Sequence, residues 1–275
     1  MNVSIEDIKK LRDMTGFGVQ DCKNALAESG CDIDKALVLL KGKIASVAEK
    51  RANNQTNEGF VVANSSKDRK FGCIVSLLCE TDFVARTEEY IDSARKLVNI
   101  AIENKISNID DLNNFKVGST TISEMVFDLV GKFQEKIKLD YVSLSGDNIY
   151  FYNHNLSNKL SSLVDITVSN CADIDDIGKV IAVQVASFQP IYIDRDSVPK
   201  NVLDSWENGI LTDDLKSKND VTKERIIKGR LEKIFRGKLL LDQPLYLDND
   251  ISVGEYLKKN SNAIVNSFKF ISISS

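Results

Sequence analysis

The chain has 275 residues, of which 43% are hydrophobic and 28% are charged, and its formal net charge is −4. This length suffices for two or three modest domains, and the composition is that of an ordinary folded protein. The negative charge argues against a general nucleic-acid binder, which needs surplus Lys and Arg to displace the counterions of the phosphate backbone.

The five cysteines are odd in number and scattered, and no C-x-x-C pair occurs. They indicate neither a disulfide framework nor a zinc site, so buried, reduced thiols are expected. The N-terminus is polar and acidic, unlike a signal peptide, and no uninterrupted apolar stretch approaches the roughly 18 residues that span a bilayer. We therefore expect a soluble, cytoplasmic protein without membrane contact.

Residues 1–47 predict three short helices joined by tight turns. A stripe of Ile and Leu at helical spacing follows Ser4, a residue type that caps helix starts. Gly30 is placed to end the second helix, and Asp32 is placed to begin the third. Residues 48–58 are polar and predict a linker.

Residues 59–142 change to the period of strands and are expected to form the first half of an α+β core. Residues 60–63 and 71–78 predict a hairpin. A helix with apolar residues at helical spacing follows over 90–101, and two further helical pieces are expected between 109 and 131.

The same order recurs in residues 143–275. Residues 148–152 and 160–169 predict a second hairpin, residues 175–188 predict a helix whose apolar stripe ends at Phe188, and residues 263–273 predict a closing strand. We interpret this as an internal structural repeat, detected by pattern and not by residue identity. Both halves are expected to hold antiparallel hairpins covered on one face by helices.

Residues 197–238 interrupt the second half with two helix-like segments, 199–211 and 221–235, around a polar, turn-like stretch over 213–220. This pattern predicts a helical hairpin that projects from the body. The second segment and the residues after it concentrate positive charge, at Lys223, Arg225, Lys228, Arg230, Lys233, Arg236 and Lys238. A solvated basic face is the simplest interpretation, and docking on an acidic protein partner is the next. An RNA contact is disfavoured because no aromatic residues interleave the charges.

Signatures of an enzyme are missing from the sequence. The only histidine, His154, lies in a predicted turn, where a solvated side chain is more common than a catalytic base. Gly16-x-Gly18 follows a helix instead of a strand and lacks the third glycine of a dinucleotide fingerprint, and no P-loop motif occurs. We expect a binding or regulatory protein with no catalytic residues, no cofactor, no metal site and no nucleotide site of its own.

The most informative stretch is Cys79–Ala85, at the junction between a predicted strand and a predicted helix. Binding residues are common at such corners. Phe83, an apolar aromatic beside Asp82, is there either folded into the core or held out for a partner. On residue type alone, burial in the core is the more common outcome.

Four blocks of sequence carry a resemblance to a known family. They are LRxxTGxGxxDCKxAL over residues 11–26, ETDFVA over 80–85, GRLxKIF over 229–235 with LDQP over 241–244, and SVGxYL over 252–257. Together they resemble elongation factor Ts, the guanine-nucleotide exchange factor of bacterial and organellar elongation factor Tu. The order and spacing of the blocks agree across nearly the whole chain.

The resemblance implies a fold and a set of partner contacts. The fold is a ubiquitin-associated-like (UBA-like) N-terminal domain, a two-part α+β core and a projecting helical hairpin. The implied tip, which dislocates Mg²⁺ from elongation factor Tu, consists of Thr81, Asp82, Phe83 and Val84. Phe83 would be wedged between helices of the partner's GTPase domain, and Asp82 would fix the loop or touch the partner. The other implied partner contacts are Lys23, Val130, Gly131, His154, Tyr246 and Leu247.

The implied function is binding of elongation factor Tu–GDP, disruption of its Mg²⁺ and phosphate sites, and promotion of GDP release so that GTP can rebind during protein biosynthesis. Self-association through the core or the hairpin is retained as a further expectation. Two alternatives come from other classes. One is an adaptor of the ubiquitin-associated type without exchange activity, and the other is an RNA-binding accessory protein built on residues 223–238.

Overall fold

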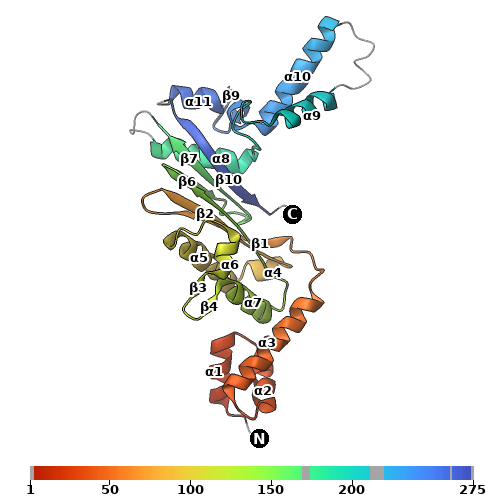
Figure 1. The fold of residues 1–275 in the computed structure, drawn as a ribbon, viewed down its shortest axis with the longest axis vertical. Coiled ribbons are helices and arrows are strands. Elements are labelled where there is room, and N and C mark those ends of the chain that lie inside the picture. Colours follow the sequence, from red (N-terminus) through yellow and green to blue (C-terminus); the bar gives the residue numbers. More distant parts are fainter. Residues whose placement is uncertain (1–2, 169–173, 211–219, 261, 274–275) are drawn as a thin grey trace.

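The computed structural model describes residues 3–168, 174–210, 220–260 and 262–273. Figure 1 shows an elongated molecule, with a helical unit at the N-terminal end, a core of sheets and helices in the middle, and a helical hairpin at the other end. This mixture of helices and antiparallel strands confirms the predicted α+β class.

The N-terminal unit is formed by α1 (Ile5–Thr15), α2 (Val19–Glu28) and α3 (Ile33–Lys50). Its helix ends follow from the local sequence. Ser4 Oγ accepts the N–H of Asp7 at 3.0 Å, and Asp32 Oδ1 accepts two N–H groups at the start of α3. Gly16 and Gly30 take the left-handed conformation after α1 and α2, with φ of 71° and 70°. The predicted helices are confirmed here.

Helix α3 extends into the stretch that was predicted to be a linker. It ends at Lys50 and not at residue 47, because Val47 and Ala48 pack against the main hydrophobic cluster. That cluster is continuous from the N-terminal unit into the first half of the core. The polar connection between the helix and the first strand is therefore shorter than expected.

The first half of the core is a sheet covered on one face by helices. Its strands run antiparallel in the order β1-β2-β5: β1 (Glu58–Ser65), β2 (Phe71–Cys79) and β5 (Lys138–Ser145). The covering helices are α5 (Glu88–Glu103), α6 (Ile109–Asn114) and α7 (Ile122–Phe133). A short hairpin of β3 (Lys116–Val117) and β4 (Thr120–Thr121) joins α6 to α7.

Strand β5 is not predicted by the sequence pattern. Polar residues such as Lys138, Asp140 and Ser143 interrupt its apolar positions, so the two-residue period is weak. It nevertheless pairs with β2 along its whole length. The predicted boundary between residues 142 and 143 therefore falls inside a strand.

The second half repeats this plan. Its strands run antiparallel in the order β10-β7-β6: β6 (Ile149–Asn153), β7 (Leu160–Thr167) and β10 (Ile264–Ser272). Helix α8 (Ile174–Phe188) covers it, together with α11 (Val253–Lys259). The short elements before α11 are the 3-10 turn η3 (Leu240–Asp242), β8 (Pro244–Leu245) and β9 (Asp248–Ser252).

The repeat is longer than predicted, because in each half a third strand returns to pair with the second strand of the hairpin. Phe188, predicted to continue the buried stripe of α8, is 38% exposed at the end of that helix. The predicted end of the second strand, Ser169, and one cysteine, Cys171, lie outside the described residues. Of the described cysteines, Cys22, Cys73 and Cys79 are buried, whereas Cys31 is only half-buried.

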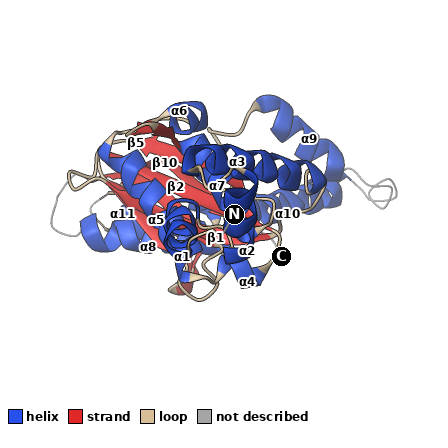
Figure 2. Ribbon diagram, turned by 90° about the horizontal axis from the view of Figure 1, so that it is seen from below, coloured by secondary structure: helices blue, strands red, loops and turns tan. Residues whose placement is uncertain are grey.

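The sheets of the two halves pack face to face. Val61, Ile74 and Leu144 of the first sheet meet Ile149 and Leu163 of the second. The layers thus run helix, sheet, sheet, helix, and Figure 2, which looks along the molecule, shows the strands at the centre.

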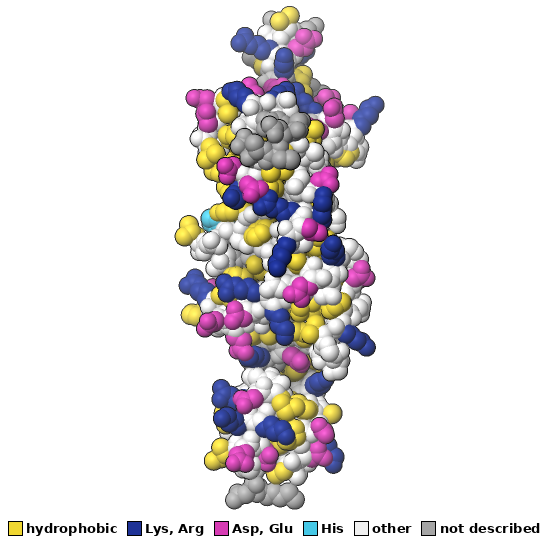
Figure 3. Space-filling model, turned by 90° about the vertical axis from the view of Figure 1, so that its left-hand side faces the viewer, with side chains coloured by type: hydrophobic (Ala, Val, Ile, Leu, Met, Phe, Trp, Pro, Cys, Tyr) yellow, Lys and Arg dark blue, Asp and Glu magenta, His cyan; other side chains and the backbone are white. Residues whose placement is uncertain are grey.

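The projecting hairpin consists of α9 (Lys200–Ile210) and α10 (Asp220–Lys238). A small cluster of its own packs the two helices together, with Val198, Phe235 and Leu239 buried and Trp206 beside them. Of the predicted turn over 213–220, residues 213–219 lie outside the described residues. On the face drawn in Figure 3, acidic and basic side chains are interspersed along the whole molecule.

Within the described ranges, no helix combines the length and the apolar character that crossing a membrane requires.

Candidate functional site

The stretch around Phe83 forms a single helical turn, α4 (Asp82–Ala85), between β2 and α5. Two threonines delimit it. Thr81 Oγ1 accepts the N–H of Val84 at 3.4 Å, and Thr87 Oγ1 donates to the carbonyl of Val84 at 2.9 Å while capping α5. Ala85 turns into the core, whereas Phe83 is 82% exposed. The more common outcome for a corner aromatic, burial in the core, is therefore wrong for Phe83.

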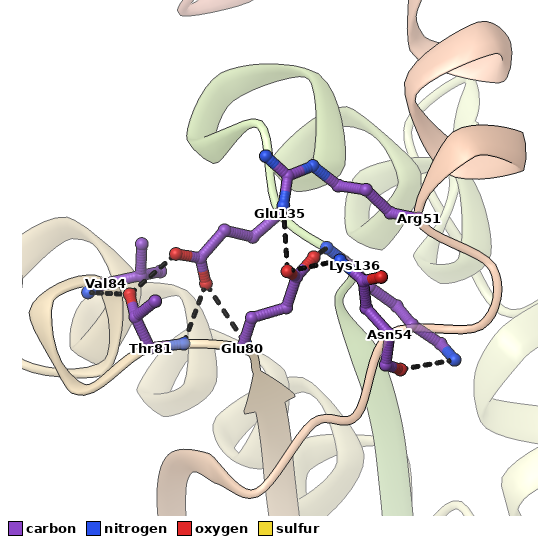
Figure 4. A network of polar contacts seen from close by, with 7 residues as sticks. All are labelled: Arg51, Asn54, Glu80, Thr81, Val84, Glu135 and Lys136. Atoms are coloured by element: carbon purple, nitrogen blue, oxygen red, sulfur yellow. Dashed lines mark hydrogen bonds and ion pairs between the residues drawn. The ribbon is translucent and has the colours of Figure 1, made fainter.

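A buried carboxylate holds the chain just before this turn (Figure 4). Glu135, 8% exposed, lies between α7 and β5. Its Oε2 accepts the N–H groups of Glu80 and Thr81 at 3.0 and 3.1 Å, and its Oε1 accepts the Thr81 hydroxyl at 2.6 Å. Bonds from N–H or O–H groups to a carboxylate are stronger than bonds between neutral groups.

The Glu80 carboxylate in turn accepts hydrogen bonds from the residue after Glu135 and from the connection after α3. Its Oε1 accepts the N–H of Lys136 at 2.6 Å, and its Oε2 accepts from Arg51 at 2.8 Å and from Asn54 at 2.7 Å. Burial works to raise the pKa of this carboxyl, but the bonds from Lys136, Asn54 and Arg51 outweigh it, so that the pKa of Glu80 is lowered. The connection after α3 is thereby tied to the tip.

A cavity of about 720 Å³ opens beside α4. Asp82 and Arg86, which form an exposed ion pair at 3.0 Å, line one side, and the β6–β7 turn lines the other. Leu156, at the apex of that turn, is 93% exposed. Two exposed apolar side chains, Phe83 and Leu156, therefore belong to the segments that border the same cavity.

His154 lies at the start of the β6–β7 turn and is half-buried, in contrast to the freely solvated side chain expected from the sequence. Its Nδ1 is 3.0 Å from the Tyr152 hydroxyl. The turn itself is pinned, because Asn158 N–H donates to the carbonyl of His154 at 2.8 Å and Val61 N–H donates to the carbonyl of Asn158 at 2.8 Å. Figure 3 shows the histidine, in cyan, beside hydrophobic side chains.

Tyr246 and Leu247 lie at the β8–β9 turn. Tyr246 is half-buried, and its N–H donates to Gln184 Oε1 at 2.9 Å, whereas Leu247 is 60% exposed. Burial and the neighbouring Tyr152 raise the pKa of Tyr246. His154 and Tyr246 thus both lie on the second half of the core, in two different turns.

The remaining sequence-predicted contacts belong to the N-terminal unit or adjoin it. Lys23 is exposed on α2. Val130 and Gly131, in contrast, are buried in α7, and a Cβ on Gly131 would lie 2.7 Å from Phe17 and 2.6 Å from Ile44. The structure therefore places Val130 and Gly131 under the N-terminal unit and not on the surface.

Glu135 and Leu156 belong to the candidate site but are not found by sequence reasoning. Glu135 follows α7 in a stretch with no regular pattern, and nothing in the sequence links it to Glu80, which lies on another element. Leu156 is the one apolar residue in the polar run His154–Lys159, a signal too weak to use alone. Among the residues that the structure describes, no group of three or more His, Cys, Asp or Glu is placed to hold a metal ion.

The family model described as "Elongation factor TS" matches residues 80–273. The chain is 37% identical over 273 residues to elongation factor Ts of Amoebophilus asiaticus, with 98% of each chain covered. It is 35% identical to that of Prosthecochloris aestuarii, with 95% of each chain covered, and 32% identical to that of Cytophaga hutchinsonii, with 99% of each covered.

Proposed function

The chain belongs to the elongation factor Ts family, and on this premise we propose that it is a guanine-nucleotide exchange factor for elongation factor Tu. It binds the GDP form, disrupts the Mg²⁺ and phosphate sites and promotes GDP release, so that GTP can rebind during translation elongation. The observation that carries the proposal is Phe83, a large apolar side chain 82% exposed on a turn whose ends are fixed.

The proposed reaction makes and breaks no covalent bond. An exchange factor binds the nucleotide-free partner more tightly than the GDP form. By linkage, the factor by which it weakens GDP binding is also the factor by which GDP weakens its own binding. The proposal therefore requires a contact that is better made once the nucleotide has left. It includes neither a catalytic residue nor a nucleotide, metal or cofactor site on this chain, and it places the protein in the cytoplasm.

Phe83 is the proposed source of that contact. Burying it against the partner is worth roughly 1.5–3 kcal/mol, and only the part of this gain that is absent from the GDP-bound state drives exchange. Wedged between helices next to the Mg²⁺ and phosphate sites, the ring turns this gain into a looser grip on the ion and the phosphates. Thr81, Asp82 and Val84 shape the turn that presents it.

The other contacts anchor the complex. His154 and the Tyr246–Leu247 pair lie on the second half of the core, and Lys23 extends the interface to the N-terminal unit. Leu156 joins the proposed interface, because it borders the cavity beside α4. We assign Val130 and Gly131 an indirect part, since they seat the N-terminal unit on α7.

The test is the release of a fluorescent GDP analogue from elongation factor Tu, with wild-type protein, Phe83→Ala and Val221→Ala. Val221, 79% exposed on α10, is a matched exposed apolar control outside the proposed face. We expect strong acceleration by the wild type and by Val221→Ala. Phe83→Ala should accelerate GDP release about tenfold less than the wild type, or worse, because burial of Phe83 is worth roughly 1.5–3 kcal/mol and 1.4 kcal/mol corresponds to a factor of ten.

If the wild-type protein does not raise the rate of GDP release above its spontaneous value, the exchange activity is refuted and the adaptor interpretation is favoured instead. Strong acceleration by both variants would keep the activity and refute the wedge.

A further inference from the structure

We propose that Glu135 is a positioning residue for the tip: it fixes the direction in which Phe83 points, and exchange depends on it through Phe83. The inference rests on the proposed function, in which the Phe83 ring is the group inserted into the partner. Glu135 itself is buried and is not expected to touch elongation factor Tu.

The first support is the set of donors that reach this carboxylate. Within the described chain they all come from the residues directly before α4: two consecutive N–H groups, of Glu80 and Thr81, and the Thr81 hydroxyl. A buried carboxylate is costly unless such bonds compensate it. Glu135 thus connects the α7–β5 junction to the segment that carries the tip.

The second support is a relay into the turn. A hydroxyl donates one hydrogen bond and accepts through its lone pairs. Because the Thr81 hydroxyl donates to Glu135 Oε1, its lone pairs are left for the N–H of Val84, which it accepts at 3.4 Å. The carboxylate therefore sets the orientation of Thr81, the residue that caps α4 and lies two positions before Phe83.

The third support is reciprocity. Glu135 accepts the N–H of Glu80, and Glu80 accepts the N–H of Lys136, the residue after Glu135. Two chain segments that bind each other's backbone in this way cannot slide past one another without breaking both bonds. Arg51 and Asn54 add the connection from α3 to the same arrangement.

Phe83 needs such support because it has little packing of its own. The residue is 82% exposed, so the backbone of a single helical turn fixes the direction of its Cα–Cβ bond and thereby the region that the ring can reach. A reacting or binding group gains from being held in its productive direction before the partner arrives, because less freedom is lost on binding. We infer that the buried carboxylate provides this preorganisation.

The experiment measures two quantities of GDP release from elongation factor Tu: the maximal rate at saturating exchange factor, and the factor concentration that gives half of it. Glu135→Ala should slow the maximal rate by up to about tenfold, the loss expected for Phe83→Ala, because it acts through that ring. The half-saturating concentration should change much less, because the anchors remain. The maximal rate of Glu135→Gln should lie between those of the wild type and Glu135→Ala. The amide oxygen still accepts the two N–H groups, but the amide nitrogen cannot accept the Thr81 hydroxyl.

Glu124 offers a matched control. At the start of α7 it accepts the N–H and the hydroxyl of Thr121 at 2.8 and 3.1 Å, the same kind of bonding away from the tip. Glu124→Ala should leave the exchange rate unchanged. The double variant Phe83→Ala/Glu135→Ala should be no slower than Phe83→Ala alone, because Glu135 acts through the ring.

A wild-type maximal rate in both Glu135 variants, or a double variant slower than Phe83→Ala by the full Glu135 effect, would overturn the positioning role. Should Glu135→Ala not fold, Glu135→Gln and its double variant decide in the same way. If Phe83→Ala lowers the maximal rate of GDP release and the Glu135 variants do not, the positioning role alone is refuted. If Phe83→Ala keeps the wild-type rate, the wedge on which that role rests is refuted.

Discussion

The Cζ atom of Phe17 lies where a side chain on Gly131 would begin: a Cβ there would be 2.7 Å away. Ile44 approaches the same point to 2.6 Å. Phe17 and Ile44 are each 2% exposed, so neither side chain has open space to move into. The absence of a side chain in the last turn of α7 therefore allows the N-terminal unit to lie directly on the core.

Gly131→Ala should therefore destabilise the protein, by about 1–3 kcal/mol for overpacking. Gly229, on α10 with nothing within 4 Å of an added Cβ, is the matched control. In an exposed helix, Gly→Ala is favourable by roughly 1 kcal/mol. Urea unfolding of both variants should show shifts of opposite sign. A stabilised Gly131→Ala would mean that the N-terminal unit does not rest on this site.

Leu156→Ser should weaken binding to elongation factor Tu and leave the stability of the protein unchanged. A side chain 93% exposed contributes little to folding, so the unfolding free energy should stay within about 0.5 kcal/mol of the wild type. The concentration for half-maximal GDP exchange should rise about tenfold, since burial of a leucine is worth roughly 1.5 kcal/mol or more. Val221→Ser, equally polar and outside the cavity, should leave this concentration unchanged. An unaltered value in Leu156→Ser would remove the β6–β7 turn from the interface.

Asp175 should make stability depend on pH in the acid range. Hydrogen bonds from Arg69 and from Tyr150, at 2.7 Å for the tyrosine, lower the pKa of Asp175 from 3.8 to about 2. A carboxyl with a lowered folded-state pKa contributes stability that is complete above its unfolded pKa and is lost as the pH falls through the folded one. The window is therefore between pH 3.8 and about 2.

Urea unfolding at several pH values tests this directly. Asp175→Asn should be less stable than the wild type at pH 7, and the difference should shrink across that window. Asp147→Asn, which removes an exposed ion pair with Lys70 at 3.1 Å, should have little effect at any pH. A difference for Asp175→Asn that does not vary with pH would contradict the assignment.

Phe235→Ala should unfold the hairpin before the core. Phe235 is 7% exposed in a small cluster that is separate from the main ones, and Phe→Ala in a core costs about 3–5 kcal/mol. The only tryptophan of the chain, Trp206, packs next to Phe235 with ring centroids 6.4 Å apart. Its fluorescence should change at a lower denaturant concentration than the far-ultraviolet circular dichroism of the core. Coincident transitions would show that hairpin and core unfold as one unit.

The parts that sequence predicts well have local causes. Capping residues such as Ser4 and Asp32, and glycines such as Gly30, act on their own neighbours, so helix ends can be placed from them. The hairpins β1–β2 and β6–β7 follow from their hydrophobic period. The resemblance over residues 80–85 implied an exposed Phe83, as the structure has it, although residue type alone favoured burial.

The parts that sequence missed depend on contacts between distant segments. Strand β5 is held by its pairing with β2 and not by its own weak pattern. The bonds between Glu135 and Glu80 arise only when α7 and β2 have packed against each other. The burial of Gly131 likewise depends on where the N-terminal unit comes to rest.

The order of the strands has a consequence for how the protein is made. The first sheet is complete once β5 has been synthesised, because β5 pairs with β2. The second sheet must wait for β10, which comes after α8, the projecting hairpin and α11 but pairs with β7. During that interval β7 presents an unpaired edge, the kind of surface that promotes aggregation of nascent chains. We expect the half that carries Phe83 to fold on the ribosome ahead of the half that carries His154.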